Sequence, residues 1–506
     1  MNHSKYLIGL DLGTTRVKAL LVSAGGEIIA TADETYPLDR PEDNAAEQDP
    51  ELWLRNSYRV ISSVVSSSGI EPEKITGVGL AGQMHTAVFL DEILKPVRPA
   101  ITWADSRSAN QAKRIERELG KDTLLDITYN RSLPGFTAPK VLWLKENEPD
   151  VFSKVKKLVL PKDYLRYRLT GELKAEKAGA SATLLFDLEA EKWSEQMLEL
   201  VGLKPDSVPP LVESSAIAGS ITEEASEMTG LVEGTPVVAG AGDQQAGALG
   251  IGAVEPGTVI STIGTGGQLF ATAKNLVEPE EGRVHVFRQC IPHSWHVMGA
   301  MQAAGLALRW FKESVVEYSR DGEITYEHLS ELASRAPAGS GNLLFLPYLT
   351  GERSPHLDPE ARGCFVGLNL NHDLTHMVRS IMEGVTFGMR DSMKILQKMG
   401  LPIDEIRCAG GGASSPVWRE IQAEVYNRTV ARTNIEDSAA LGAALLAGIG
   451  TNLFPPDPVK STELFLEVTE KVEPNSEKAE VYDRLHERYQ SIYRALKPEF
   501  KKLQSD

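Results

Sequence analysis

The first residues of the chain that could do chemistry are Asp11 and the turn Gly13-Thr14-Thr15. Valine, isoleucine and leucine on both sides of this turn favour two strands, and Gly13 permits the tight reversal between them. The amides and hydroxyls of such a turn can donate hydrogen bonds to phosphate oxygens. Asp11 stands at the end of the first expected strand, where its carboxylate can hold, through water, the Mg²⁺ that accompanies ATP. An ordinary hairpin with a polar tip fits this segment equally well.

A second hairpin of the same design is expected at Gly257–Thr272, around the turn Gly264-Thr265-Gly266-Gly267. Two further segments, 240–245 and 409–416, also combine glycine with small polar residues. Glycine lets the backbone approach a ligand closely, and its amides can all face an anion. Each segment alone is a weak signal, but four in one chain, two of them in matching hairpins, favour a nucleoside triphosphate site. The sequence contains no G-x-x-x-x-G-K-[ST], so this is not a P-loop enzyme.

Asp243 is the best candidate for a catalytic base. It follows an expected strand and lies between the glycines of a turn and the pair Gln244-Gln245, where a sugar hydroxyl could reach it. Aspartate before Gln-Gln-Ala-Gly-Ala-Leu is also a fair helix N-cap, and from this segment alone the capping role is the better interpretation. The two roles are compatible.

A polyol pocket could be lined by Met84 and His85, which follow an expected strand, together with Trp103 and Asp105. The Trp103 ring offers an apolar face and the Asp105 carboxylate offers an acceptor. A single histidine is more often structural than functional, so His85 enters this set through the family resemblance described below.

The segment Gly77–Gly82 satisfies G-x-G-x-x-G, and Asp105 lies roughly where a ribose-binding acid would be expected. A dinucleotide-binding fold requires a helix to begin at those glycines. Residues 83–91 look instead like a turn and a strand, so we expect no NAD-type site.

The chain has 506 residues, which is too long for one core, so two domains of about 200–250 residues are expected. The formal net charge of −17 argues against a nucleic-acid partner, because binding to a phosphate backbone needs a basic face. No apolar run approaches the ~20 residues that span a bilayer, and the N-terminus lacks the apolar region of a signal peptide. We therefore expect a cytoplasmic protein without a membrane partner.

The three cysteines, Cys290, Cys364 and Cys408, stand far apart, which predicts buried thiols in a reducing compartment and no disulfide framework or metal site. His293 and His296 form an H-x-x-H pair, but no further ligands with metal-site spacing accompany them. A surface or core pair is therefore expected.

The first half of the chain alternates strand-like and helix-like segments. We expect strands at 27–35, 75–80 and 86–91 and helices at 50–66, 111–120 and 138–148. Near the other end, residues 477–496 carry apolar side chains at steps of four, four, three and four: Val481, Leu485, Tyr489, Ile492 and Leu496. This spacing predicts an amphipathic helix, and because the stripe is short it favours packing on its own domain over a dimer seam.

Two long stretches give the chain a specific resemblance to a known family. Gly135-Phe-Thr-Ala-Pro-Lys-Val-Leu-Trp-Leu-Lys-Glu-Asn147 resembles the first signature of the FGGY carbohydrate kinases, and Gly363-Cys-Phe-Val-Gly-Leu, continuing to His376-Met-Val-Arg-Ser-Ile-Met-Glu383, resembles the second. The resemblance implies an α/β fold of two actin-like ATPase (ribonuclease H-like) domains, residues 1–245 and 246–506, that face a central cleft. It also implies a sugar kinase that uses ATP and Mg²⁺ and forms a homodimer.

The resemblance assigns roles to individual residues. Asp243 corresponds to the general base and, with Asp11, to the acids near the metal ion. The residues implied for the nucleotide are Gly13, Thr14, Thr15, Lys18, Thr265, Gly266, Gly410, Gly411, Gly412 and Ser415. Those implied for the sugar are Met84, His85, Trp103, Asp105, Asp243 and Gln244.

Within the family, four segments are most similar to the kinases of D-xylulose: Ala81–His85, Gly135–Lys140, Leu160–Gly171 and Phe345–Pro355. This similarity implies transfer of the γ-phosphoryl group of ATP to O5 of an open-chain ketose. Asp243 would accept the hydroxyl proton, and closure of the two domains around the sugar would keep water from acting as the acceptor.

Two departures keep another sugar open. The segment Ile101–Arg107 is closer to gluconate kinases, and Thr86 follows His85 where kinases of D-xylulose usually have glycine. D-Gluconate is therefore the alternative substrate, with Arg107 as the candidate partner for its carboxylate. Glycerol kinases share the sequence 242–245 but carry an Arg-Glu pair where this chain has Gln-Met-His, which makes glycerol a poorer candidate.

A different class of function would be an ATP-driven binding protein of the same superfold, such as actin or a heat-shock chaperone. Such a protein needs the phosphate hairpins but neither a sugar pocket nor an aspartate that faces an acceptor. The two family signatures favour the kinase. An inactive sugar-binding regulator is disfavoured because Asp11 and Asp243 are both present.

Overall fold

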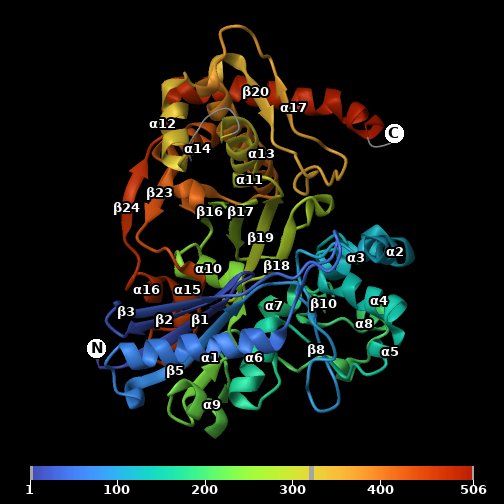
Figure 1. Ribbon diagram of the computed structural model, residues 1–506, viewed down its shortest axis with the longest axis vertical. Coiled ribbons are helices and arrows are strands. Elements are labelled where there is room, and N and C mark those ends of the chain that lie inside the picture. Colours follow the sequence, from blue (N-terminus) through green and yellow to red (C-terminus); the bar gives the residue numbers. More distant parts are fainter. Residues whose placement is uncertain (1–3, 318–323, 504–506) are drawn as a thin grey trace.

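The computed structural model describes residues 4–317 and 324–503 and has two halves, each built around a seven-stranded sheet (Figure 1). The blue hairpin of Figure 1 belongs to the lower half, and the yellow-to-red segments form most of the upper half. The first sheet has the order β13 (Ile217–Ser220), β14 (Pro236–Val238), β5 (Ile75–Gly82), β1 (Tyr6–Leu12), β2 (Arg16–Ser23) and β3 (Ile28–Thr35), and β15 (Ala241–Gly242) also pairs with β5.

The second sheet repeats this design. Its order is β18 (His285–Arg288), β19 (Trp295–Met301), β17 (Gly267–Ala273), β16 (Gly257–Ile263), β22 (Ile403–Ala409), β23 (Thr429–Thr433) and β24 (Val468–Val472). In each sheet a strand forms an antiparallel hairpin with the next strand in sequence and pairs in parallel, on its other side, with a strand that comes later. The predicted matching hairpins are thus confirmed, and a tight turn closes each of them.

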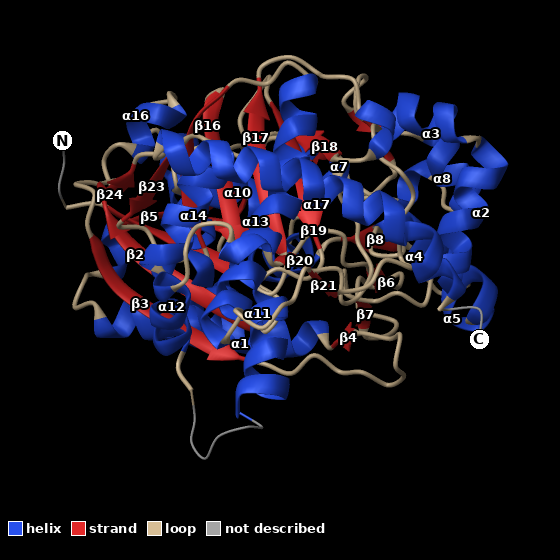
Figure 2. Cartoon of the chain, turned by 90° about the horizontal axis from the view of Figure 1, so that it is seen from above, coloured by secondary structure: helices blue, strands red, loops and turns tan. Residues whose placement is uncertain are grey.

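Helices cover both sheets and form a lobe beside the first one. Helix α1 (Pro50–Ser67), capped by Asp49, packs on β2 and β3, and α13 (Leu374–Lys398) packs on β17 and β19 (Figure 2). The lobe and its surroundings contain α2 (Ala109–Leu119), α3 (Lys121–Thr128), α4 (Thr137–Asn147), α5 (Pro149–Phe152), α6 (Pro161–Thr170), α7 (Lys177–Ser181), α8 (Glu195–Val201) and α9 (Glu223–Thr229). The other half contains α11 (Gly305–Phe311), α12 (Tyr326–Arg335), α14 (Pro416–Tyr426) and α16 (Pro458–Thr462).

Short strand pairs brace the loops between these elements. They are β4 (Glu47–Gln48) with β7 (Ala100–Ile101), β6 (Val88–Leu90) with β8 (Lys157–Val159), β9 (Ala175–Glu176) with β12 (Leu211–Val212), β10 (Phe186–Asp187) with β11 (Lys192–Trp193), and β20 (Leu344–Leu346) with β21 (Cys364–Val366).

Two helices lie together between the sheets. Helix α15 (Ser438–Gly450) packs on β1 and β5, and α10 (Asp243–Gly250) packs on α15. Glycines make this approach possible: a Cβ on Gly9 would lie 1.9 Å from the Ala440 carbonyl oxygen, and one on Gly442 would lie 1.8 Å from that of Ala246. A late segment of the chain is thereby fixed to the first sheet.

The predicted C-terminal helix is α17 (Ser476–Lys502), and it packs on its own half of the molecule. Leu485 and Tyr489 of the predicted stripe are buried in the second core, and so are Tyr482 and Tyr493, which the stripe did not include. The tyrosine hydroxyls have partners there, because that of Tyr482 donates to the Glu383 carboxylate at 2.7 Å.

The remaining sequence predictions about the fold stand as follows. Gly77–Gly82 lies within β5 and no helix begins there, as expected. Cys290 and Cys408 are buried free thiols, and Cys364 is a partly exposed one. His296 is buried and His293 is exposed, and the described residues hold no group of three or more metal-ligating side chains. Among the same residues, no helix combines the length and apolar character that a membrane span needs.

Candidate active site

Asp11 and Asp243 lie at the carboxyl ends of two parallel strands, β1 and β15, that flank β5. Asp11 pairs with Ala81 of β5, and Ala81 pairs with Ala241, two residues before Asp243. Burial and the nearby charge of Asp11 raise the pKa of Asp243 to about 7, and burial raises the pKa of Asp11 to about 6. Two carboxyl groups with raised pKa values that interact through their charges are typical of an active site and unusual elsewhere.

The backbone before Asp243 can take its path only because two glycines precede it. Gly240 has φ +83°, and a Cβ there would lie 2.0 Å from the Leu80 carbonyl oxygen. Asp243 begins α10, and its Oδ1 accepts a hydrogen bond of 2.8 Å from the amide of Gln244, the next residue. The N-cap position itself is Gly242, so the capping role considered for Asp243 does not hold.

The first phosphate turn is tied to the expected sugar pocket. The Trp103 indole donates to Thr14 Oγ1 at 2.9 Å, the Gln48 amide donates to the Thr14 carbonyl at 2.5 Å, and the Tyr36 hydroxyl donates to the Gly13 carbonyl at 2.6 Å. Thr15, the other hydroxyl of the turn, is exposed. The turn is held by these hydrogen bonds and by that of the Gly13 amide to the Arg16 carbonyl, at 3.0 Å, which leave the amides of Thr14 and Thr15 and the Thr15 hydroxyl available to a ligand.

A chain of buried polar side chains, which no sequence pattern predicted, joins this turn to the pocket. The Gln83 amide donates to Gln48 Oε1 at 3.0 Å, and the Thr86 hydroxyl donates to Gln83 Oε1 at 2.8 Å. The amide of Trp103 in turn donates to the Thr86 hydroxyl at 3.1 Å. Thr86 is thus a structural link between the turn that carries Thr14 and the loop that carries Trp103.

Lys18 lies on β2 and forms an ion pair of 2.7 Å with Asp437, the residue before α15. Asp437 also lies close enough to Asp11 to raise its pKa. Lys18 is therefore held near the phosphate turn by a carboxylate, and a nucleotide would have to share it with Asp437.

His85 is held in a single orientation. Its φ is +65°, and its carbonyl accepts hydrogen bonds of 2.9 Å from both Lys140 Nζ and the Thr137 hydroxyl. Because the Ala182 carbonyl can only accept, the 2.5 Å contact to it places a proton on His85 Nδ1. Burial keeps the pKa of His85 well below its usual value, so the imidazole is neutral and Nε2 is a hydrogen-bond acceptor.

The other predicted sugar residues take different positions. Met84 is buried against Gly242, next to Asp243, and Gln244 is partly buried beside them. Trp103 is 38% exposed and presents its ring to the cleft.

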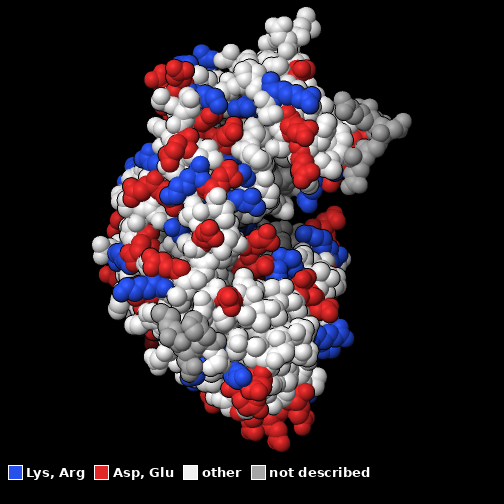
Figure 3. Space-filling model, turned by 90° about the vertical axis from the view of Figure 1, so that its left-hand side faces the viewer, with Lys and Arg blue, Asp and Glu red and all other residues white. Residues whose placement is uncertain are grey.

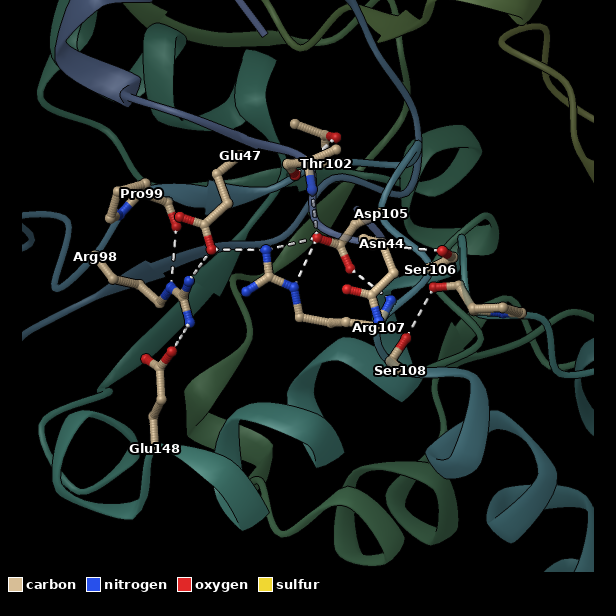
Figure 4. Close-up of polar contacts among 12 residues, drawn as sticks. Asn44, Glu47, Arg98, Pro99, Thr102, Asp105, Ser106, Arg107, Ser108 and Glu148 are labelled. Atoms are coloured by element: carbon tan, nitrogen blue, oxygen red, sulfur yellow. Dashed lines mark hydrogen bonds and ion pairs between the residues drawn. The ribbon is translucent and has the colours of Figure 1, made fainter. Parts of the chain in front are cut away.

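Asp105 lines the cleft, but its carboxylate already accepts hydrogen bonds from other residues of the protein (Figure 4). Its oxygens accept hydrogen bonds from the Ala46 amide at 2.8 Å, from the Arg107 amide at 3.0 Å and from Arg107 Nε at 2.8 Å. Arg107 also pairs with Glu47 at 2.8 Å, and Glu47 pairs with Arg98. This network neutralises Arg107 and orders the loop that carries Trp103.

Four of the six nucleotide residues predicted in the second half line a cavity of about 470 Å³. Thr265, Gly411, Gly412 and Ser415 are among its walls. Gly410 lies behind them with φ +75°, where a Cβ would be 2.7 Å from the Ile263 carbonyl oxygen. The cavity is also lined by Arg309, Tyr326 and Trp418, which sequence reasoning missed because no local pattern distinguishes them.

A larger cleft of about 710 Å³ lies between the two halves. Trp103 and Gly135 line it from one half, and Gly266 and Arg353 line it from the other, while Thr265 borders both this cleft and the 470 Å³ cavity. On the face shown in Figure 3, the outline of the molecule is notched between its upper and lower parts, and acidic and basic side chains are interspersed around the notch.

The carboxylate oxygens of Asp11 and Asp243 are suitable ligands for a hydrated Mg²⁺ ion. Asp11 Oδ1 is buried and has no hydrogen-bond partner among the described residues, and Asp243 provides a second carboxylate nearby. Mg²⁺ usually keeps several waters and binds through one or two carboxylates together with substrate phosphates. Two carboxylates without a full protein cage match that requirement.

Comparisons with known proteins agree with this geometry. Residues 6–250 match the model of the N-terminal domain of the FGGY family of carbohydrate kinases, and residues 259–451 match that of its C-terminal domain. The chain is 36% identical over 489 residues to the xylulose kinase of Bacillus subtilis (strain 168), with 97% of each chain covered. It is 33% identical over 450 residues to the gluconokinase of the same organism, with 88% of this chain and 87% of that one covered. The crystal structure of a xyloylose kinase from Brucella ovis has a TM-score of 0.90 at 36% identity, over 97% of this chain and 99% of that one.

Proposed function

Because the chain belongs to the FGGY family of carbohydrate kinases, we propose that D-xylulose is the sugar it phosphorylates, at O5 and with the γ-phosphoryl group of ATP. Relatives that are 36% identical over nearly the whole chain are named for that sugar. The observation that carries the proposal is the position of Asp243, at the same edge of the first sheet as Asp11 and directly after Gly242, against which Met84 packs.

In this proposal Asp243 accepts the proton of the attacking hydroxyl group. Phosphoryl transfer has a loose transition state, so positioning and charge neutralisation supply most of the acceleration. Mg²⁺, when bound near Asp11, would neutralise the phosphate charge. The amides and hydroxyls of the two turns, from Gly13 to Thr15 and at Thr265 and Gly266, would donate to phosphate oxygens.

The same proposal gives the pocket residues their roles. His85 Nε2 accepts a hydrogen bond from a sugar hydroxyl, since its tautomer is fixed by Ala182. Trp103 covers the carbon chain of the sugar, and Met84 closes the pocket beside Asp243. Arg107, the partner considered for the carboxylate of D-gluconate, is paired with Asp105 and Glu47, which favours an uncharged sugar.

A coupled assay of ADP release over a panel of acceptors tests this proposal. The panel contains D-xylulose, L-xylulose, D-ribulose, L-ribulose, D-gluconate, glycerol and erythritol, and Asp243→Ala is assayed in parallel. We expect D-xylulose to have the highest kcat/KM and the substitution to lower kcat by about 10²–10⁴-fold, the range that a general base contributes. A preference for D-gluconate would refute the substrate, and no dependence on any sugar would refute the proposal altogether.

We further propose that the chain forms a homodimer, as its family resemblance implies. Light scattering on the eluted protein should then give twice the 55.2 kDa of one chain. A monomer at micromolar concentration would refute this.

A further inference from the structure

Arg353 belongs to a loop of the second half that is fixed to the second phosphate hairpin. Glu352 Oε1 accepts hydrogen bonds from the Gln302 amide at 3.0 Å and from the Arg353 amide at 2.7 Å. Gln302 follows the last residue of β19, Met301, whose carbonyl oxygen would lie 2.8 Å from a Cβ on Gly266. The backbone of Arg353 is therefore anchored beside the turn that carries Thr265 and Gly266.

The guanidinium of Arg353 points the other way, across the cleft toward the sugar pocket. Its Nη2 lies 3.5 Å from the place that a Cβ on Gly135 would occupy. Burial lowers the pKa of His85 and of Lys140, the two residues whose contacts shape that pocket, and the charge of Arg353 acts in the same direction. One side chain thus spans the distance between the second phosphate turn and the acceptor site.

No described residue neutralises this guanidinium through a hydrogen bond or an ion pair. Burial raises the pKa of the neighbouring Glu352 to about 8, and its Oε2 has no hydrogen-bond partner among the described residues. Burial also lowers the pKa of Arg353, whose side chain is partly exposed to the cleft. By contrast, Arg131 on the same cleft makes two hydrogen bonds to Glu116, at 2.6 and 2.7 Å.

A partly exposed cation that lines a cleft and has no protein partner can pair with an anion that enters the cleft. The guanidinium fork matches the equatorial oxygens of a phosphoryl group, to which it can donate two parallel hydrogen bonds. The anion that must pass between Thr265 and the sugar hydroxyl is the transferred phosphoryl group.

We propose that Arg353 is a catalytic residue that contacts the phosphoryl group while it passes from ATP to the sugar. This inference rests on the proposed function. In the step, the sugar oxygen forms a bond to the γ-phosphorus, and the bond from that phosphorus to the β,γ-bridging oxygen breaks, with its electron pair leaving on ADP. The hydroxyl proton goes to the Asp243 carboxylate. Arg353 keeps its protons and donates hydrogen bonds to the equatorial oxygens, where negative charge must be held in the transition state.

The test compares Arg353→Gln and Arg353→Lys with the matched variant Arg131→Gln, which removes a paired cation from the same cleft. Rates are measured with saturating ATP, Mg²⁺ and D-xylulose, and sugar affinity is measured separately by calorimetry. We expect Arg353→Gln to lower kcat by about 10²–10³-fold, as loss of a transition-state donor does, with the Kd for D-xylulose within about twofold of the unmodified protein. Arg353→Lys should be intermediate, and Arg131→Gln should keep kcat within about twofold.

Each other outcome has a distinct meaning. A wild-type kcat in Arg353→Gln overturns the inference, and so does a lost sugar affinity with an unchanged kcat, which would make Arg353 a sugar-binding residue. If the unmodified protein acts on D-gluconate and Arg353→Gln raises only the KM for that acid, Arg353 binds the substrate carboxylate and the inference is likewise wrong. No activity of the unmodified protein toward D-xylulose would refute the proposed function itself.

Chemical rescue distinguishes the loss of a catalytic contact from a folding defect. Guanidinium ion at millimolar concentration should restore part of the kcat of Arg353→Ala and should leave Arg131→Ala unchanged. Failure of rescue in an Arg353→Ala protein whose melting temperature is that of the unmodified protein would count against a direct contact with the phosphoryl group.

Discussion

At the scale of single residues, the site holds charges that the folded protein would be more stable without. Asp11 and Asp243 lie at the same edge of the first sheet and both have raised pKa values, and Arg353 is a cation without a partner among the described residues. Such groups lower the stability of the folded state, so they are retained where function requires them. Substitutions that remove them should therefore separate stability from activity.

Asp243→Asn should stabilise the protein while abolishing its activity. The pKa of Asp243 is raised from 3.8 to about 7, so the unfolded chain loses this proton near pH 4 and the folded one near pH 7. The stability of the unmodified protein relative to the variant should fall as pH rises from 4 to 7 and stay level above 7. The full difference corresponds to about 4 kcal/mol, at about 1.4 kcal/mol per pKa unit.

Melting temperatures from pH 4 to pH 8.5, in EDTA and without nucleotide, measure this difference. The variant should melt a few degrees higher at pH 8 and at the same temperature at pH 4. Substitution of an exposed carboxylate, Asp206→Asn, is the control and should show no such trend. A lower melting temperature for Asp243→Asn at pH 8 would contradict the account.

At the scale of elements, local sequence predicted the hairpins and distant contacts decided the rest. The turns at Gly13 and Gly264 could be predicted from the sequence because apolar strand residues flank them directly. The pairing of Lys18 with Asp437 and the reach of Arg353 to Gly135 join segments that lie far apart in the chain, so no local pattern reveals them. Arg353 lies within Phe345–Pro355, one of the segments similar to the kinases of D-xylulose, but only the fold shows that its guanidinium faces Gly135.

The packing of α15 between the sheets gives the element-scale prediction. A methyl group on Gly442 would lie 1.8 Å from the Ala246 carbonyl oxygen, whereas one on Gly247 of α10 would meet its nearest atom at 3.4 Å. Alanine favours a helix over glycine by about 1 kcal/mol in both places. We expect Gly442→Ala to destabilise the protein by about 3 kcal/mol through overpacking and Gly247→Ala to be neutral or stabilising.

Thermal melting of the two variants in one buffer compares them directly. Gly442→Ala should melt well below the unmodified protein, and because α10 begins at Asp243 it should also lose kcat. Equal melting temperatures for the two variants would show that α15 can shift without cost, which the carbonyl contacts of Gly9 and Gly442 argue against.

At the scale of the whole molecule, the reaction needs groups from both halves at one point. Asp243, His85 and Trp103 lie on the side of the first sheet, and Thr265 and Arg353 come from the other half across a cleft of about 710 Å³. Water is present in an open cleft at far higher concentration than any sugar and would compete as the acceptor. Closure over the sugar would exclude it and would bring Arg353 to the phosphoryl group.

Sugar and nucleotide together should therefore make the molecule more compact. Small-angle scattering of Asp243→Asn with MgATP and D-xylulose should give a smaller radius of gyration than the same protein alone, because this variant can hold both substrates without turnover. Either substrate alone should give a smaller change, and the unmodified protein should hydrolyse ATP slowly until sugar is added. Identical scattering with and without both substrates would mean that the cleft does not close. In that case Arg353 would have to reach the phosphoryl group by moving its side chain alone, and water would have to be excluded by Trp103 and the sugar.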